Sequence, residues 1–209
     1  MATCKSEASS GNVTVVDKRD NKEYTVRYIN DACWMTQNLQ FTGTGINSTT
    51  TNINTSKTIS YGDLTSGDSY TQARIHSGTD NNGNATVWYN FAAASAMTIT
   101  GSSNSTNSTY DLCPKNWHLP SYNIAPGSAT GITGYASAFG VVTGGYYENG
   151  GIGGGDYRVG RWWTSQAISS TGRYRLDYSW QGGFNTNTNN ADNYDLRSFG
   201  RYIRCVRTS

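Results

Sequence analysis

The sequence predicts one compact domain, or at most two, that is rich in strands and loops and takes its core from aromatic side chains. Only 35% of the 209 residues are apolar and 14% are charged, against about 25% charged in an ordinary globular domain. Glycine (24), asparagine (21), tyrosine (15) and tryptophan (6) are abundant instead. Helix-forming residues are too scarce for a helical bundle. No apolar run approaches the roughly 18 to 20 residues of a membrane-spanning helix, so no membrane span is expected.

Alternating apolar and polar residues predict a β-hairpin over residues 11–30. Val13 and Val15 alternate with polar residues before the turn-like sequence DKRDNK, and Tyr24 and Val26 do so after it. Each strand would bury one face.

The middle of the chain is predicted to hold loops and one helix. The polar tract 43–83 is expected to form long loops with short strands and little core. The segment ATVWYNFAAASAMT (85–98) is the best helix candidate, because it is rich in alanine and places Val87, Phe91 and Ala94 at helical spacing.

The C-terminal half is predicted to end in strands at 161–166, 173–180 and 201–207, with a long polar loop between the last two. Residues 116–209 contain no lysine but eight arginines. Its loops are dominated by Tyr, Asn, Asp, Gly and Arg, the mixture that recognition surfaces use, since Tyr and Arg give large contacts and Asn and Gly give adaptable hydrogen bonds. The alternative is a polar loop whose tyrosines belong to the core.

Residues for catalysis or metal binding are few. Neither histidine, His76 or His118, has a partner at metal-ligand spacing, and His118 in NWHLP is expected to be a half-buried structural residue. No cysteine pair has C-x-x-C spacing. Asp63 and Asp68 are expected to lie in a solvated turn rather than a calcium loop. A pair of acidic residues for glycoside hydrolysis stays open, because sequence does not report carboxylate separation. Glutamate occurs only three times, at 7, 23 and 148, and none lies in a motif, so we predict no catalytic residue, no metal and no cofactor.

Charge and cysteine content bear on partners and location. A pI near 8.3 without a basic block gives no electrostatic footprint for nucleic acid, so none is expected as a partner. Four cysteines in a polar chain suggest two disulfides and an oxidising compartment, with buried free thiols as the alternative. The N-terminus MATCKSEASS has neither a basic nor an apolar signal region, so no signal segment is expected in this chain.

Several phrases, in order along most of the chain, carry a family resemblance. They are DKRDNKEYTV (17–26), CWMTQNL (33–39), WYNFAAASA (88–96), LCPKNWHLPS (112–121), RWWTSQ (161–166), YRLDYS (174–179) and GRYIRCV (200–206). Together they resemble the Fibrobacter succinogenes major paralogous domain of secreted and surface bacterial proteins. The sequence departs from the family after Pro120, and neither the first 16 residues nor the tract 43–83 matches a family motif.

The resemblance implies an α+β, C-type-lectin-like fold with two helices, a small twisted antiparallel sheet and extensive loops. The terminal strand would lie near the amino-terminal one, and residues 1–209 would form a single domain, at the cell surface or secreted. It also implies a disulfide Cys113–Cys205, or a nearby long-range pair, and a second disulfide Cys4–Cys33. The calcium-binding motifs of animal C-type lectins and the reactive cysteine pair of the formylglycine-generating branch have no counterpart here.

The same fold displays the variable region of diversity-generating retroelement proteins. There, mutation of template adenines turns Asn codons into Asn, Asp, Ser, Tyr, Gly, Thr or Arg codons. Residues 157–194 are enriched in that set, which makes a diversified, ligand-binding segment over about 157–194 a hypothesis.

Strand alternation in YRLDYS places Leu176 toward the core and Arg173, Arg175 and Asp177 outward. Trp117 and Trp163 are expected in the core. The predicted ligand-binding residues combine this outward face with the polar loop: Tyr157, Arg158, Arg173, Arg175, Asp177, Trp180, Asn185, Asn187, Asn189, Asp192 and Tyr194.

The leading functional hypothesis is a monomeric display domain that binds a protein or glycan through this C-terminal surface. The alternatives are an enzyme, either hydrolytic or related to formylglycine-generating sulfatase-modifying factors, and a structural module of the cell envelope.

Overall fold

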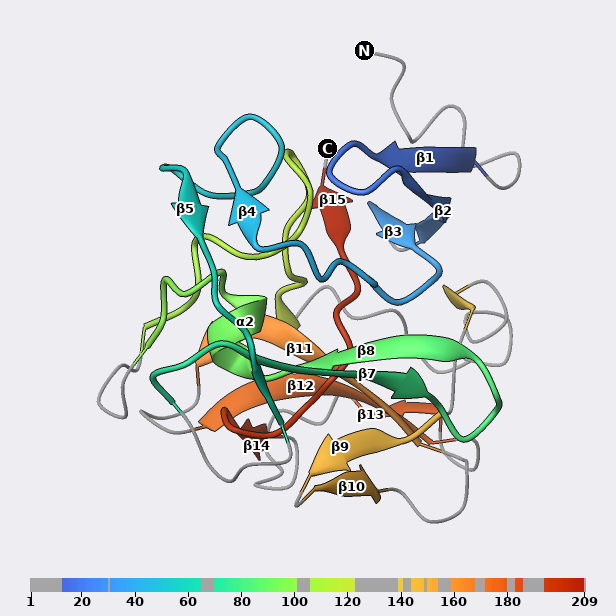
Figure 1. Cartoon of the computed structure of the whole chain (residues 1–209). Coiled ribbons are helices and arrows are strands. Elements are labelled where there is room, and N and C mark those ends of the chain that lie inside the picture. Colours follow the sequence, from blue (N-terminus) through green and yellow to red (C-terminus); the bar gives the residue numbers. More distant parts are fainter. Residues whose placement is uncertain are drawn as a thin grey trace.

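The computed structural model describes most of the chain and five small sheets within it (Figure 1). The residues described are 13–29, 31–64, 70–100, 106–122, 139–140, 144–148, 150–153, 159–167, 172–179, 183–185 and 194–208. For residues 174, 179, 183–185, 194 and 195 only the backbone is described.

Strands dominate the described residues. In chain order the elements are β1 (Val13–Asp17), β2 (Lys22–Ile29), β3 (Ala32–Met35), β4 (Gly45–Ile46), β5 (Lys57–Thr58), β6 (Gly62–Asp63), β7 (Arg74–Thr79), β8 (Ala85–Tyr89), α2 (Phe91–Ala94), β9 (Tyr146–Glu148), β10 (Gly151–Gly153), β11 (Val159–Ala167), β12 (Gly172–Ser179), β13 (Gly183–Asn185), β14 (Tyr194–Leu196) and β15 (Val206–Thr208).

The predicted fold class is wrong. Of the structure described, 48% is strand and 4% is helical, and no helix reaches seven residues. The strands form several small sheets, in which β6–β7 is the single parallel pairing among the named strands described. The described chain is therefore mostly β, and the α+β, C-type-lectin-like fold with two helices does not describe it.

The N-terminal sheet confirms the predicted hairpin. β1 pairs with β2 in antiparallel register from Val13 opposite Val26 to Asp17 opposite Lys22. The sheet continues through β3 to β15, in which Val206 lies opposite Trp34. The C-terminal strand thus joins the N-terminal sheet, as expected. It is shorter than the predicted strand 201–207, because residues 200–202 make only isolated bridges.

The predicted helix 85–98 divides into the strand β8 (Ala85–Tyr89), the single helical turn α2 (Phe91–Ala94) and a turn. Thr86, Val87, Trp88 and Tyr89 are β-branched or aromatic and favour the extended backbone of β8. The helix starts only after Asn90, whose side chain caps it by accepting a hydrogen bond from the Ala93 amide at 3.0 Å. It ends after one turn.

The polar tract 43–83 contains short strands and loops, as predicted, but it also supplies core. Ile46, Ile53, Ile59 and Leu64 are all buried. These isolated apolar residues reach the core from separate short strands and loops, so they leave no periodic pattern in the sequence.

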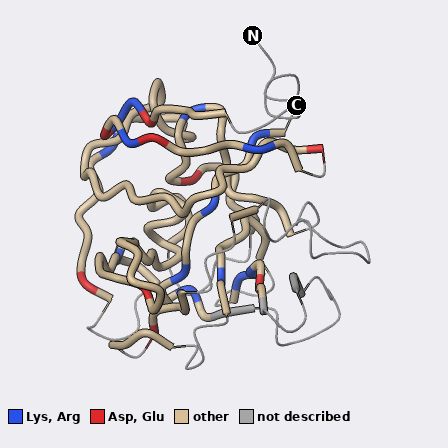
Figure 2. Tube along the Cα trace, turned by 90° about the vertical axis from the view of Figure 1, so that its right-hand side faces the viewer, with Lys and Arg blue, Asp and Glu red and all other residues tan. Residues whose placement is uncertain are grey.

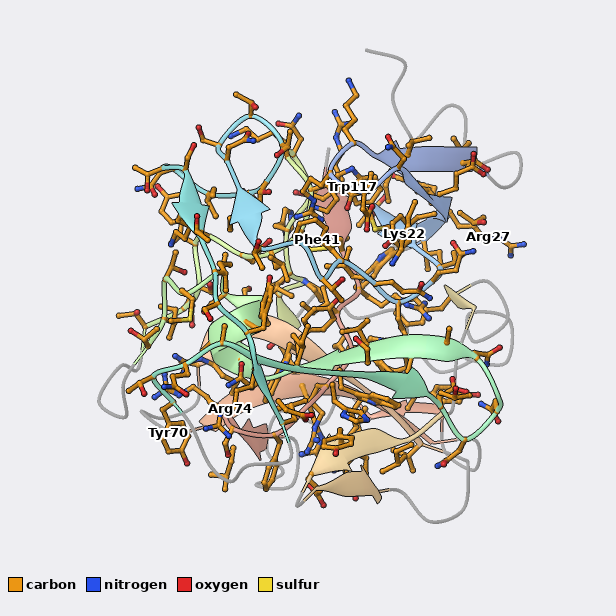
Figure 3. All side chains as sticks on the ribbon, in the orientation of Figure 1. Lys22, Arg27, Phe41, Tyr70, Arg74 and Trp117 are labelled. Carbon is orange, nitrogen blue, oxygen red and sulfur yellow. A yellow bond between two sulfur atoms is a disulfide. The ribbon has the colours of Figure 1, made fainter. Side chains whose placement is uncertain are left out.

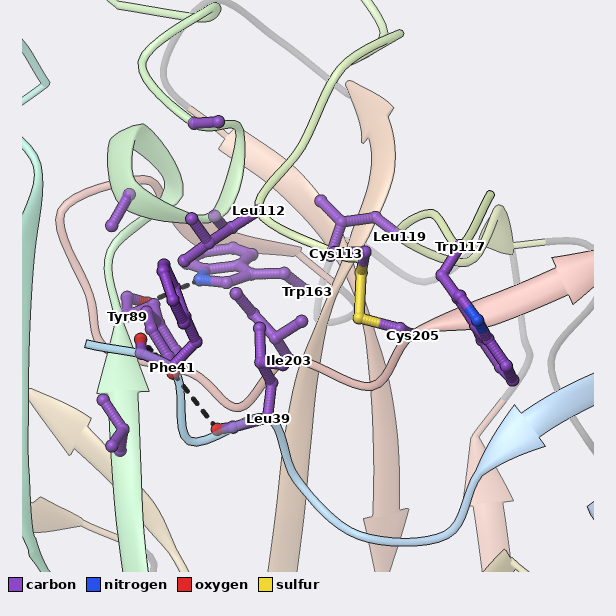
Figure 4. Close-up of a cluster of buried hydrophobic side chains, with 14 of the residues drawn as sticks. Leu39, Phe41, Tyr89, Leu112, Cys113, Trp117, Leu119, Trp163, Ile203 and Cys205 are labelled. Atoms are coloured by element: carbon purple, nitrogen blue, oxygen red, sulfur yellow. Dashed lines mark hydrogen bonds between the residues drawn. A yellow bond between two sulfur atoms is a disulfide. The ribbon is translucent and has the colours of Figure 1, made fainter. Parts of the chain in front are cut away.

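The sheet formed by β11, β12, β13 and β14, called here the C-terminal sheet, separates two hydrophobic clusters. Trp163 on β11 packs edge-on against Phe91, with ring centroids 5.4 Å apart, in the cluster drawn in Figure 4. Its indole donates a hydrogen bond to the Tyr89 carbonyl at 2.7 Å. The adjacent Trp162 lies opposite Leu176 and belongs to the other cluster. Both faces of β11 and β12 are therefore covered.

A disulfide joins Cys113 to Cys205 across 92 residues, with a Cα–Cα distance of 5.7 Å, which confirms the expected pair. Cys33 is also disulfide-bonded, and its expected partner, Cys4, lies outside the described residues. No helix in the described ranges is long and apolar enough to cross a membrane.

Candidate functional site

A cluster of arginines, carboxylates and one tyrosine lies where β9 meets the C-terminal sheet, in the lower half of Figure 1. We call it the guanidinium–aromatic cluster. Strand register builds it: Arg161 on β11 lies directly opposite Asp177 on β12, so their side chains share one face of the sheet. Its members are Tyr146, Glu148, Arg161, Arg175, Asp177 and Arg201.

Asp177 links the two strands. Its carboxylate lies 3.1 Å from Nη2 of Arg175 on its own strand and 3.6 Å from Nε of Arg161 on β11. A carboxylate held between two guanidiniums is fixed in position, and it holds both of them in turn.

The ring of Tyr146 contacts the guanidinium groups of Arg161 and Arg201. The Cζ atom of Arg161 is 3.9 Å from the ring centroid of Tyr146, and that of Arg201 is 4.6 Å away. Arg201 also donates to the carbonyls of Gly200 and Tyr147 at 2.9 and 3.3 Å and pairs with Glu148 at 3.3 Å. Cation–π contacts of this kind orient both the ring and the cation.

Exposure is graded across the cluster. The side chains of Glu148, Arg161 and Asp177 are 25%, 19% and 17% exposed, whereas those of Arg175 and Arg201 are 7% and 0% exposed. The buried arginines form the base and the half-buried groups form the rim. Such a rim offers a ligand a donor fork, two acceptors and an aromatic ring in fixed positions, which suits non-covalent recognition.

Two of the predicted site residues are not on the surface. Arg173 and Arg175 were expected to point outward, but they are 0% and 5% exposed. Asp177 is half-buried, and Arg175 and Asp177 do come together. Tyr157, Arg158, Trp180, Asn187, Asn189 and Asp192 lie outside the described residues, and for Asn185 and Tyr194 the side chains do.

The inward position of Arg173 and Arg175 has a physical cause. Strand alternation predicts a solvent face only where one side of a sheet is open, and here both sides are covered. The guanidinium of Arg173 lies 4.7 Å from the ring centroid of Phe91. Burial, together with the charge of Arg197, lowers the pKa of Arg173 to about 10.

The sequence did not single out Tyr146, Glu148, Arg161 or Arg201 as site residues. The sequence signal for Arg161 and Arg201 was that they lie in the half of the chain that contains arginine but no lysine. Tyr146 and Glu148 lie in a Gly-rich stretch that gave no further signal. Pairing between β11 and β12, and the bridge of Tyr147 to Gly200, bring them together.

Trp117 and Trp163 lie in the core and His118 is half-buried, as predicted. Trp163 is fully buried and Trp117 is 9% exposed. His118 is half-buried, and its Nδ1 lies 2.9 Å from the Leu119 carbonyl oxygen. Asp63 lies 3.5 Å from Nδ1 of His76. Within the described ranges, no three His, Cys, Asp or Glu side chains form a group that could hold a metal ion.

Charged residues are sparse along the chain, which is mostly tan in Figure 2.

Comparison of the chain with protein-family models, with curated proteins and with solved structures found no match. Membership of the Fibrobacter succinogenes major paralogous domain family therefore stays a prediction from the quoted phrases.

Proposed function

We propose that the chain is a non-catalytic binding domain that recognises a protein or glycan through the rim of the guanidinium–aromatic cluster. The observation that carries the proposal is the placement of Arg161, which is 19% exposed and lies between the ring of Tyr146 and the carboxylate of Asp177. Arginine and tyrosine dominate binding hot spots, and a side chain already fixed in place loses little entropy when it binds.

The buried arginines support this arrangement. Arg175 holds Asp177 and Arg201 holds Tyr146 and Glu148, so the rim is oriented from below rather than by solvent-exposed contacts. In this proposal the buried arginines, Arg175 and Arg201, orient the rim, and the half-buried Arg161 contacts the ligand.

The proposal extends to diversification of residues 157–194. What supports it is composition: this segment is rich in Tyr, Asn, Asp, Gly, Ser, Thr and Arg, the residues reached by mutating adenines in Asn codons. Sequencing many copies of this segment tests it, because variation confined to such codons is expected and uniform copies would overturn it.

Binding is tested with the full chain on two defined probes, a glycan microarray and a random peptide library displayed on phage. Ligands selected with the wild type are then measured against Arg161→Ala and, as a matched control, Arg27→Ala. Arg27 lies on β2, at the other end of the molecule from β9 (Figures 1 and 3). We expect Kd to rise at least about tenfold for Arg161→Ala and to stay unchanged for Arg27→Ala. Ligands that bind both variants equally, or the absence of any ligand on either probe, would contradict the proposal.

A further inference from the structure

A small groove lies at the opposite end of the molecule from the guanidinium–aromatic cluster, beside β1. It has a volume of about 240 Å³, below the roughly 300 Å³ at which typical pockets for drug-sized ligands begin. Its size therefore suits one sugar ring or a molecule of similar bulk. The lining residues are Val16, Lys18, Thr49, Thr50, Pro114, Lys115, Asn116 and Trp117.

Main-chain hydrogen bonds join the two chain segments that form the walls of the groove. The Lys115 amide donates to the Thr50 carbonyl at 2.9 Å, and the Asn52 amide donates to the Cys113 carbonyl at 2.9 Å. Cys113 is in turn fixed by its disulfide to Cys205. A groove built this way is already shaped before a ligand enters, which lowers the entropy cost of binding.

The charged groups at the groove are two lysines and one neutralised pair. Lys18 and Lys115 are exposed, and neither makes an ion pair within the described part of the chain. Next to Lys18, the buried Arg19 is paired with Asp17 at 2.6 Å, so that pair adds no net charge. Among the described residues that line the groove, none carries a carboxylate. The groove therefore favours an anion.

The two threonines add hydrogen-bond acceptors. Asn47 Oδ1 accepts from the hydroxyls of Thr49 and Thr50 at 2.5 and 3.2 Å. Because each hydroxyl proton is directed to Asn47, each oxygen keeps its lone pairs for a donor in the groove. A ligand that carries hydroxyl groups would supply such donors.

Three of the four remaining lining residues are apolar, and the fourth is the exposed Asn116. Val16 is 51% exposed, and Val16, Pro114 and Trp117 all line the groove. Exposed aliphatic side chains cost free energy in water, and the C–H face of a sugar ring would cover them.

We propose that this groove binds a single acidic sugar, a hexuronic acid, with its carboxylate at Lys18 and Lys115 and its hydroxyls at Thr49 and Thr50. The inference goes beyond the proposed function, because it concerns a different surface and does not depend on the cluster at β9. An acidic peptide would also satisfy the lysines, and its amide N–H groups can donate to the threonine oxygens, but it has no C–H ring face to cover Val16, so a glutamate dipeptide is the probe that separates the two ligands.

The experiment is a titration of the full chain with D-glucuronate, followed by ligand-observed NMR or calorimetry. D-glucose, with the same ring and no carboxylate, should bind at least about tenfold more weakly. Acetate and a glutamate dipeptide, which have carboxylates and no sugar ring, should also bind more weakly. Failure of glucuronate to bind would overturn the proposal, as would equal or tighter binding of any of the three other probes.

Variants locate the site. The double variant Lys18→Gln/Lys115→Gln should raise the Kd for glucuronate at least about tenfold, since it removes both charges. Lys22→Gln, on the same hairpin but outside the groove lining, is the matched control and should leave the Kd unchanged. Circular dichroism checks that each variant folds. Equal affinity of the double variant and the control would place glucuronate elsewhere and overturn the proposal.

Discussion

The two ends of the molecule use positive charge differently. At the N-terminal sheet the exposed cations of the groove are lysines, Lys18 and Lys115, and the buried Arg19 beside them is neutralised by Asp17. Around β11 and β12 the cations are arginines, several of them fully buried, including Arg173, Arg201 and Arg204.

The difference follows from the two side chains. An ammonium group is compact and strongly hydrated, whereas a guanidinium is planar, less hydrated and able to stack on rings. Arg204 illustrates the second use: it donates to Asn38 Oδ1 at 2.9 Å, to the Gly140 carbonyl at 2.8 Å and to the Phe139 carbonyl. Arginine content in a sequence can thus indicate a scaffold as readily as a binding surface.

The largest effect should come from the disulfide that ties the groove to the C-terminal segment. Cys113→Ala/Cys205→Ala removes a crosslink across 92 residues, which should lower the free energy of unfolding by about 4 to 5 kcal/mol through the added entropy of the unfolded chain. Urea unfolding followed by tryptophan fluorescence measures it. A loss below about 1 kcal/mol would show that the segments around residues 113 and 205 are held together without the crosslink.

The next effect concerns a buried carboxylate behind the groove. Asp111 accepts hydrogen bonds from the amides of Cys113 and Leu119, both at 2.9 Å, and from the side chain of Asn52 at 3.0 Å. Burial nevertheless raises the pKa of Asp111 from 3.8 to about 6. The folded protein therefore binds this proton more tightly than the unfolded chain does.

Stability contributed by Asp111 is then fully present below about pH 4 and is lost as the pH rises through about 6. A shift of this size corresponds to about 3 kcal/mol over the window. Chemical denaturation between pH 4 and pH 7 should show this component in the wild type and not in Asp111→Asn. If both proteins gave the same pH profile, Asp111 would not be the titrating group.

A smaller effect is expected at the rim of the guanidinium–aromatic cluster. Asp177→Asn weakens the contacts to Arg175 and Arg161 but leaves strand pairing intact, and the carboxylate is 17% exposed. We expect a loss of about 1 kcal/mol in unfolding free energy, intermediate between surface and buried ion pairs. A loss above about 3 kcal/mol would mean that the rim is as structural as its buried base.

Local features of the fold could be predicted from sequence. The hairpin followed from alternation on either side of DKRDNK, and β11 and β12 followed from short runs of aromatic and alternating residues. The core positions of Trp117 and Trp163 could be predicted because the tryptophan side chain is large and mostly apolar. In each case the signal lies within a few residues of the feature.

Features that depend on distant partners could not be predicted. Asn38 accepts from both Arg204 and Trp162, which lie 166 and 124 residues away in the chain. The helix prediction for 85–98 failed because the alanines dominated the pattern, although the strand-forming residues Thr86 to Tyr89 precede them. Likewise, alternation in β12 could not reveal that a second cluster covers its other face.

The central claim is that fully buried arginines hold the C-terminal half together while cations nearer the surface contribute little to stability. Its most direct test is the unfolding free energy of Arg204→Met compared with Arg27→Met, the same substitution at a half-buried position on β2. Arg204→Met leaves the Phe139 and Gly140 carbonyls without this donor and leaves Asn38 Oδ1 with Trp162 as its donor, so we predict a loss of about 3 to 5 kcal/mol. For Arg27→Met we predict less than about 1 kcal/mol. Equal losses in the two variants would contradict the account.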